Sequence, residues 1–455
     1  MSGPDLARRD FLRLAAGGAA LLAAGAHCGG SDSAKPASTA TTGGGATGKP
    51  TLRIAQWNNY VAGYDRWFDQ EYTKAWGERN EVDVAVDHFD VNQLAAHAES
   101  EVASQRGHDL FQFALSSPSP LEDQVIDHRE IIEAVEAKVG KMTPLVERSV
   151  FNPATKKYFG VSDFWGQSPI HYRTDLWGSI GQLPDSWEDL VSAGTRLKAQ
   201  GHPIGIGMGD DAEANVILLG LMHGYGASVQ DDEGRVVINS PATVAAVKLG
   251  ASLYKSAMSP EVLNWDITSN NRYFVSGRGS LIVNSIAAIR ALETQDPELA
   301  VKTGLLPVPR GPRSRLGPYA VGIYVIWKFS ENQEAAKRFL VDLVTDYRQP
   351  LVQSRFLQFP SFSGAVGGPA SLVASDAQAV PPDKYRLLAG AAEWTTNMGY
   401  PGHANAAIDE VVKTSLITQM FAAAARGDMS AEDAVKAAEA RIKPIFDKWR
   451  QQGKI

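Results

Sequence analysis

Strand-like and helix-like patterns alternate along the chain after residue 50, and this alternation constrains the fold more than any other feature. Residues 51–55 are predicted as a first strand, 82–86 alternate as a second, and 109–113 form a third. In 335–344 the apolar residues recur at spacings of three and four, which predicts a helix with one buried face. We therefore predict an α/β protein.

The length that follows residue 50 predicts two lobes. About 400 residues exceed one ordinary hydrophobic core and suit two lobes of roughly 150 to 250 residues, with a cleft between them. The chain has 44% hydrophobic and 21% charged residues, which is a globular composition. A formal net charge of -7 gives no basic face for nucleic acid, so nucleic acid is not an expected partner.

The first residues read as an export signal. Arg8 and Arg9 precede a short apolar run from Leu14 to Ala26, which is well below the roughly 20 apolar residues that a membrane-spanning helix needs. A pair of arginines in this position is typical of the twin-arginine export route. We expect residues 1–27 to be this signal and the protein to work outside the cytoplasm.

Cys28 is the only cysteine of the chain and stands directly after the apolar run. A Gly/Ser/Thr/Ala-rich tract follows it, so 28–50 is predicted to be a flexible linker behind a lipid-modified cysteine. The alternative is ordinary cleavage after Ala26, since His27 is unusual before a lipidated cysteine. The expected location is the cell envelope, in the periplasm or at the outer face of the cytoplasmic membrane, and the mature body has no disulfide.

Sequence motifs of catalysis are absent. The chain has no GxSxG elbow, HExxH pair or phosphate-binding loop, and no paired Cys/His cluster for a structural metal. The glycines at 205, 207 and 209 are spaced too closely for a dinucleotide loop and are better explained by a strand over 203–208 that breaks at Gly209. No cofactor and no metal are expected.

Aromatic residues beside amides and acids, in loops that follow strands, give the positive signal. In open α/β sheets the ligand crevice lies beyond the carboxyl ends of the strands. A sugar needs flat rings for its apolar faces and amides or acids for its hydroxyls. The candidate ligand-binding residues are Trp57, Asn58, Asn59, Tyr60, Ser116, Ser117, Asp163, Trp165, Asp210, Asp211, Glu213, Trp265, Asp266, Asn284, Tyr319, Tyr324, Trp394 and Tyr400.

Other residues are predicted to be structural. Trp76, Trp177, Trp187 and Trp449 lie in helical or post-strand apolar patterns and are expected in the cores. A serine with an acid or amide three residues later marks a helix start at 186, 330 and 430.

A series of ordered segments between residues 158 and 402 carries a further signal. The segments are Tyr158–Val161, Ile170–Leu176, Pro184–Leu190, Asn271–Gly277, Leu281–Asn284, Leu306–Pro312, Ser330–Ala336 and Gly399–Gly402. In content and order they resemble the extracellular solute-binding proteins of ABC importers, specifically the sugar-binding family that includes maltose-binding protein. The resemblance spans residues 51 to about 450.

The resemblance implies the two-lobed periplasmic-binding-protein-like fold (type II), with the ligand cleft between the lobes. Lobe 1 is expected to comprise 51–163 and 302–333, and lobe 2 to comprise 164–301 and 334–455. The crossings between lobes are expected near 161–165, 301–305 and 330–336. The implied protein is a monomer that binds its ligand by hinge closure, hands it to the permease subunits of an ABC transporter, and makes or breaks no bond.

Three alternatives stay open. Trp57 to Tyr60 also resembles a turn of spermidine- and putrescine-binding proteins, and the acids at 163, 210, 211, 213 and 266 suit a polyamine. A secreted carbohydrate-active enzyme would likewise place aromatic rings and carboxylates around a cleft. A protein that reports its ligand to a receptor would differ only in its partner.

Overall fold

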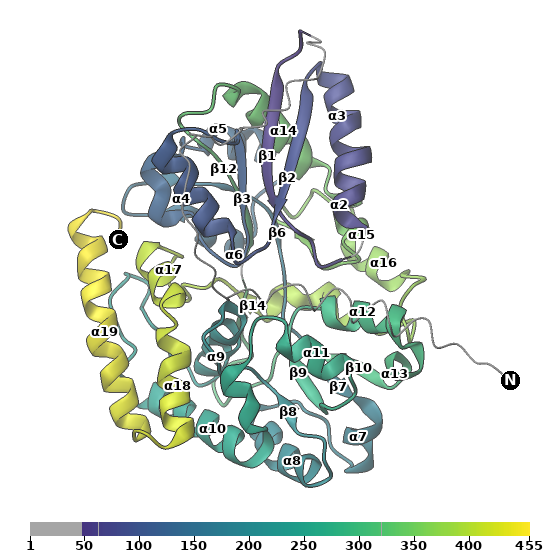
Figure 1. Ribbon diagram of the computed structural model, residues 1–455, viewed down its shortest axis with the longest axis vertical. Helices are drawn as coiled ribbons and strands as arrows, with labels where there is room; N and C mark the ends of the chain where they lie inside the picture. The colour runs from purple at the N-terminus through teal and green to yellow at the C-terminus, as the bar shows by residue number, and fades with distance from the viewer. Residues whose placement is uncertain (1–47, 62, 320) are drawn as a thin grey trace, which may run out of the picture. The chain divides into compact units, whose positions relative to one another are not determined.

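The computed structural model describes residues 48–61, 63–319 and 321–455. The predicted export signal, Cys28 and the linker residues before 48 lie outside the described residues. Residues Lys49–Ile455 form one unit, and this unit contains two main β-sheets (Figure 1).

The first sheet has six strands in the order β13-β6-β12-β3-β1-β2. The strand β1 runs parallel to β2 and β3, while β12 is antiparallel to β3 and β6, and β13 is antiparallel to β6. The strands are β1 Thr51–Trp57, β2 Asp83–Phe89, β3 Leu110–Phe113, β6 Val161–Trp165, β12 Val321–Ile326 and β13 Phe359–Pro360. The three strands predicted first along the chain are confirmed, and all three belong to this sheet.

Helices pack along this sheet and share one hydrophobic core with it, which we call the first lobe. The pairs α3 with β2 and α4 with β3 are in contact. The helical elements are α2 Tyr64–Trp67, η1 Phe68–Tyr72, α3 Thr73–Asn80, α4 Leu94–Ser104, η2 Ser119–Gln124, α5 Arg129–Val139, α6 Pro144–Val150, α14 Gln333–Thr345, α15 Arg348–Gln353, α16 Pro369–Ala374 and η4 Arg386–Glu393.

The second sheet has four strands in the order β10-β7-β9-β8 and forms, with its helices, the second lobe. Its strands are β7 Ile170–Arg173, β8 Ile204–Gly205, β9 Leu281–Val283 and β10 Thr303–Leu306. The helical elements of this part are α7 Thr174–Ser179, α8 Trp187–Ala199, α9 Ala212–Gly224, α10 Pro241–Ala257, η3 Pro260–Asn264, α11 Ser269–Val275, α12 Ala287–Gln295, α13 Pro297–Val301, α17 Ala406–Lys413, α18 Leu416–Arg426 and α19 Ala431–Gln451.

The chain passes between the lobes at three places. The first passage is 166–169, between β6 and β7, and the second lies between β10 and β12. The third follows η4 and includes β14 Thr395–Thr396, which pairs in parallel with β11 Gly317–Pro318 of the second passage. A further hairpin joins β4 Phe151–Asn152 to β5 Lys157–Tyr158. Two of the three passages are therefore hydrogen-bonded to each other.

The predicted lobe boundaries differ from these positions. The strand β10, expected in lobe 1, pairs with β7 of the second lobe. Residues between 334 and 394, expected in lobe 2, supply side chains from Ala335 to Trp394 to the first core. The reason is that α14 packs its apolar face against α5 and β6, so the chain stays in the first lobe for another excursion after β12.

Two of the three predicted serine caps are confirmed, and the one at Ser330 is wrong. The Ser186 and Ser430 side chains each accept an N–H three residues on, at the starts of α8 and α19. The Ser330 hydroxyl instead donates to Asp109 Oδ1 at 2.6 Å, and α14 begins only at Gln333. A carboxylate acceptor from a neighbouring strand end thus replaces the predicted capping role.

Candidate functional site

Three neighbouring cavities lie where the two lobes meet. The largest, with a volume of about 460 Å³, falls in the size range of small-ligand sites, roughly 300 to 1,000 Å³. The first lobe contributes the loops after β2 and β3, and the second lobe contributes the start of α9, the loop before α11 and α17. The lining residues are Val91, Asn92, Ala95, Ala114, Leu115, Ser116, Asp210, Asp211, Ala212, Asn264, Trp265, Asp266, Ile267, Asp409, Val412, Lys413 and Ser415.

The other two cavities share Leu115, Tyr319 and Val321 with each other. One extends toward α17 and contains Ser116 and Ser117 in its wall. The other, which we call the aromatic cavity, is lined by four rings and four aliphatic side chains. These are Trp57, Tyr60, Phe164, Tyr319, Ala114, Leu115, Val321 and Leu357. Residues 114–116 of the β3 loop thus connect the three spaces.

The turn after β1 presents two of these rings. Trp57 is the last residue of β1 and is 5% exposed, whereas Tyr60 is 42% exposed. Their ring centroids are 5.1 Å apart at an interplanar angle of 84°. The Asn59 side chain accepts the Val61 N–H at 2.9 Å, which closes the turn locally. Asn59 therefore shapes this turn, Asn58 is exposed, and both rings line the aromatic cavity.

The start of α9 brings acidic residues to the same place. Asp211 is the N-cap, and its Oδ1 accepts the N–H groups of Glu213 and Ala214, each at 2.9 Å. Burial raises the pKa of Asp211 to about 6, and the two donated N–H groups oppose that shift. A Cβ atom on Gly209 would lie 2.5 Å from the Trp265 carbonyl oxygen. Glycine at 209 therefore lets the Trp265 loop close against the start of this helix.

A cluster of buried amides adjoins Glu213. Asn284 follows β9 and is 2% exposed, and its Nδ2 donates to Asn270 Oδ1 at 3.0 Å. These amides and the Ser285 N–H oppose the rise in the pKa of Glu213 that burial causes. Burial, followed by the nearby Asp211 carboxylate, raises the pKa of Glu213 well above its usual value. Burial raises the pKa of Tyr60 and of Tyr319, and the Glu213 charge adds to both shifts.

One hydrogen bond crosses directly from lobe to lobe at the cavities. The Ser117 backbone N–H donates to Asp409 Oδ1 at 2.8 Å. Asp409 lies on α17, is 6% exposed, and pairs through Oδ2 with Lys413 at 3.0 Å. Burial raises the pKa of Asp409 although Lys413 opposes the shift. This contact holds the β3 loop against α17.

The structure gathers most of the candidate residues and separates others. Trp57, Tyr60, Ser116, Ser117, Asp210, Asp211, Glu213, Trp265, Asp266, Asn284 and Tyr319 lie in the cavity walls or directly behind them. Trp265 is half-buried beside Tyr273, and Asp266 is exposed and pairs with Arg272 at 3.1 Å.

Five candidates lie elsewhere, for reasons of packing. The Trp165 Nε1–H donates to the Pro360 carbonyl at 3.0 Å and its ring packs on Phe359, inside the first lobe. Trp394 belongs to the first core as well. The Tyr400 ring lies 5.1 Å from that of His223. The strands β6 and β12 are buried at every position, so Asp163 and Tyr324 lie inside the first lobe.

Asp163 is a buried carboxyl of the first lobe and not a cavity residue. It is 2% exposed and accepts from Gln112 Nε2 at 3.0 Å. Burial raises the pKa of Asp163 to about 7. Burial raises the pKa of Tyr64 and of Tyr324, and the Asp163 charge adds to both shifts.

Sequence reasoning missed Asp409, Lys413, Asn270 and Leu115. A signal existed for Asp409, because it stands among the buried residues Ala406, Ala407, Ile408 and Val411 of a short helix. A charged residue within an apolar stripe becomes buried, and burying a charge is costly unless it is paired. By contrast the four predicted core tryptophans are confirmed: three are fully buried and Trp449 packs half-buried on the second core.

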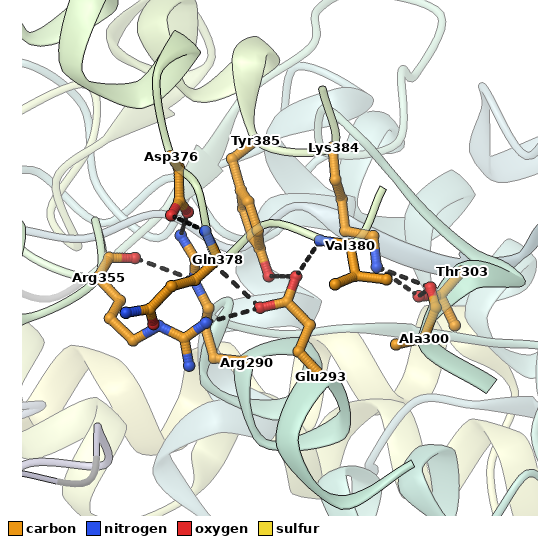
Figure 2. A network of polar contacts seen from close by, with 10 residues as sticks. All are labelled: Arg290, Glu293, Ala300, Thr303, Arg355, Asp376, Gln378, Val380, Lys384 and Tyr385. Atoms are coloured by element: carbon orange, nitrogen blue, oxygen red, sulfur yellow. Dashed lines mark hydrogen bonds and ion pairs between the residues drawn. The ribbon is translucent and has the colours of Figure 1, made fainter. Parts of the chain in front are cut away.

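A second buried polar cluster lies apart from the walls of the three cavities (Figure 2). In it Glu293 accepts from Arg290 at 3.2 Å, Arg355 at 2.9 Å and the Tyr385 hydroxyl at 2.9 Å. Arg290 also pairs with Asp376 at 2.6 Å. This charge cluster fastens α12 to the segment between α15 and η4.

Two further features bear on the class of protein. No helix within 48–61, 63–319 and 321–455 combines the length and the apolar character that crossing a membrane requires. In that described part of the chain, no group of three or more His, Cys, Asp or Glu side chains is arranged to hold a metal ion.

The chain matches a protein family over more than half of its length. The family model described as bacterial extracellular solute-binding protein matches residues 70–346. A curated relative from Deinococcus radiodurans, named "Probable ABC transporter-binding protein", is 22% identical over 230 residues. The match covers 48% of this chain and 54% of the relative, so the chain spans about half the length of that relative.

Solved structures share the fold along most of the chain. Maltose-bound MalE3 of T. maritima has a TM-score of 0.70 at 20% identity, covering 86% of this chain and 99% of that one. A sugar transporter of Arthrobacter chlorophenolicus A6 with bound laminaribiose has a TM-score of 0.72 at 16% identity, covering 87% and 99%. The predicted periplasmic-binding-protein fold is therefore confirmed.

Proposed function

Because the chain belongs to the bacterial extracellular solute-binding proteins, we propose that it captures a sugar or oligosaccharide outside the cytoplasmic membrane and delivers it to the permease of an ABC transporter. The observation that supports the proposal is the large cavity between the lobes, which Trp265, Asn92 and Asn264 line, beside the aromatic cavity of Trp57, Tyr60 and Tyr319. Rings serve the apolar faces of a sugar, and amides serve its hydroxyls. The name of the relative and the sugars in the two neighbours agree with this role.

The proposed mechanism is closure of the lobes on the ligand. A ligand that touches the β1 turn of one lobe and the α9 start of the other gains its full contacts only when the lobes are together. It therefore shifts the population toward the closed state, which the Ser117 to Asp409 bond also favours. Small-angle scattering with saturating ligand is expected to give a smaller radius of gyration than without ligand. An unchanged profile would count against closure.

A neutral sugar suits the cavities better than a polyamine. A polyamine needs several free carboxylates along its length, and the acids at the cavities have protein partners. Asp211 caps α9, Asp266 pairs with Arg272, and Asp409 pairs with Lys413. A secreted enzyme is disfavoured by membership in a binding family.

A thermal-shift screen over sugars, polyols and polyamines tests the ligand class. Binding to the folded state alone raises its stability by RT ln(1 + [L]/Kd), about 2.7 kcal/mol at a hundredfold excess over Kd. We expect a response to at least one carbohydrate that holds at both low and high salt. A response to spermidine or putrescine alone, lost at high salt because charges are screened, would replace the sugar by a polyamine.

We also propose twin-arginine export and lipid anchoring through Cys28. Replacing Arg8 and Arg9 with lysine is expected to hold the precursor in the cytoplasm. Cys28→Ser is expected to release the protein from membranes, measured by fractionation of the host cells. If the Cys28→Ser protein stays in the membrane fraction like the parent, the anchor is not on this cysteine.

A further inference from the structure

The residues that follow α19 lie on the first lobe, although α19 itself belongs to the second. Ile442 and Phe446 of this helix are buried in the second core. Beyond the end of the helix, the Lys454 ammonium pairs with Asp123 Oδ1 of η2 at 2.5 Å. The Lys454 carbonyl accepts from Asn152 Nδ2 of β4 at 3.0 Å. The end of α19 therefore bridges the two lobes.

The partners of Lys454 are fixed to the first lobe. Val125, directly after η2, and Val150, directly before β4, are part of the first core. Glu122 of η2 is 1% exposed, its Oε2 accepts from Asn152 Nδ2 at 2.7 Å, and its Oε1 lies 3.9 Å from the Lys454 ammonium. Lys454 is itself 7% exposed. A lysine carried by the second lobe thus helps to compensate a buried carboxylate of the first, which is costly to leave unpaired.

Contacts within the second lobe connect Lys454 to a second attachment between the lobes. The helices α17 and α19 are in contact (Figure 1). The Trp449 Nε1–H of α19 donates to Glu410 Oε2 of α17 at 2.6 Å, and Lys448 pairs with the same oxygen. Asp409, the neighbour of Glu410 on α17, accepts the Ser117 N–H of the first lobe at 2.8 Å. The helices α17 and α19 therefore carry both attachments as one unit.

Both attachments end on one short segment of the first lobe. Ser117 lines a cavity together with Asp409. Its hydroxyl donates to Ser119 Oγ at 2.9 Å and accepts the Ser119 N–H at 3.1 Å, at the start of η2, and the same η2 contains Asp123. Each lobe thus presents one packed element to both attachments. Separation of the lobes at Ser117 consequently strains the Lys454 contacts as well.

We propose that the contacts of Lys454 with Asp123, Glu122 and Asn152 form a latch, which holds the lobes in the arrangement that contains the Ser117 to Asp409 bond. This inference rests on the proposed function and adds a residue that sets ligand affinity from a distance. Lys454 lines none of the three cavities in the described part of the chain. A latch that favours closure leaves less of that change to be driven by the ligand.

Hydrogen exchange of the intact ligand-free protein tests the latch. The Ser117 N–H is protected only while it donates across the lobes, so its exchange rate reports the equilibrium between joined and separated lobes. We expect Lys454→Met to accelerate this exchange about tenfold, the effect of roughly 1.4 kcal/mol, which is near the lower end for a hydrogen bond to a charged group. The amides of β1, which are bonded within the first sheet, are expected to keep their rates.

Two further variants locate the effect. Asp123→Asn removes one ion pair from a side chain that is 74% exposed, so it leaves the core intact and is expected to accelerate Ser117 exchange about threefold. It keeps the inference testable if Lys454→Met folds poorly. Lys448→Met is the matched control, because it makes the same substitution on α19 but removes a pair that lies within the second lobe. It is expected to leave Ser117 exchange unchanged.

The outcomes separate the latch from the proposed function. Ser117 exchange that is unprotected in the parent, or equal in the parent and in the Lys454 and Asp123 variants, overturns the latch. An equal acceleration by Lys448→Met, or one shared by the β1 amides, also overturns it, because the effect would then be on general stability. All of these results leave carbohydrate capture intact. A thermal-shift screen with no response to any carbohydrate overturns the proposed function, whatever the exchange rates are.

Discussion

Two glutamates of this protein are buried to the same degree and have opposite surroundings. Glu293 is 8% exposed and Glu213 is 9% exposed. Glu293 lies among Arg290, Arg355 and the Tyr385 hydroxyl (Figure 2), whereas Glu213 lies among amides, rings and another acid. Burial is thus equal and only the partners differ. A carboxylate with cations of its own fastens chain segments together, whereas one without them is costly to ionise.

The contacts around Glu293 and around Glu213 also connect different parts of the chain. The Glu293 cluster ties α12 to the chain after α15, and the Arg290 guanidinium also lies 3.5 Å from the centre of the Tyr385 ring. Every member therefore has several partners. Glu213 instead follows Asp211 and Ala212, which line the large cavity at the start of α9.

Glu293→Gln tests the comparison with the largest expected effect. Removing one member of a buried charge cluster leaves Arg290 and Arg355 undercompensated, and we expect a loss of about 3 to 5 kcal/mol in the free energy of unfolding. Urea unfolding at pH 7 measures it. Glu213→Gln removes no attraction to a cation and is expected to cause no such loss.

The pH dependence of stability, compared between the parent and Glu213→Gln, tests the surroundings of Glu213 independently. The pKa of Glu213 is raised in the folded state, so the folded protein holds its proton more firmly and loses stability as pH rises above the unfolded value of about 4.3. Glutamine does not titrate. We therefore expect Glu213→Gln to gain stability relative to the parent between pH 4 and pH 8, and a relative loss would mean that the protein does compensate this charge.

Asp163→Asn extends the comparison to a carboxyl inside the first lobe. The pKa of Asp163 rises to about 7 on folding, so the parent loses stability from about pH 4 to pH 7, by no more than roughly 4 kcal/mol. Asparagine keeps the Gln112 contact without a charge. The variant is expected to match the parent near pH 4 and to exceed it at pH 8 in thermal melts. Equal pH profiles would show that Asp163 is ionised in the fold.

Trp165→Phe and Trp57→Phe separate a core indole from a cavity indole. Trp165 donates to the Pro360 carbonyl, so its loss is expected to cost about 1 kcal/mol of stability. Trp57 Nε1 has no hydrogen-bond partner in the described chain, so Trp57→Phe is expected to cost only the lost packing, less than Trp165→Phe, and to weaken ligand binding several-fold. Chemical denaturation and titration with the preferred sugar measure the two effects. The reverse pattern would exchange the roles of the two rings.

Asp409→Ala is expected to have the smallest effect. The Ser117 N–H loses its acceptor across the lobes, worth about 1 kcal/mol, which corresponds to about fivefold in Kd if the bond forms only on closure. Scattering is expected to give a slightly larger radius of gyration for the ligand-free variant. Affinity equal to that of the parent would show that this bond does not contribute to closure.

A site residue could be predicted from the sequence only where its position depends on residues close to it along the chain. Trp57, Tyr60 and Ser116 follow strand ends, and the rule that clefts lie beyond strand ends located them. Trp165 also ends a strand, yet its ring packs on Phe359 inside the first lobe, because the residues that cover it come from a distant part of the chain. Asp409 and Asn270 reach the site from helices whose positions depend on packing.

The sequence by itself determined the α/β class, most helix starts and the family, because these depend on periodicity, capping and the order of short segments. Tertiary structure decided the rest. It kept 334–394 in the first lobe through the α14 face, and it paired Ser330 with Asp109 rather than with the helix it was expected to cap. Among the residues that the structure describes, it also gave cations to Glu293 and no ion pair to Glu213. The physical reason is that the partner of a buried charge comes from another element, at a distance along the chain that no local pattern encodes.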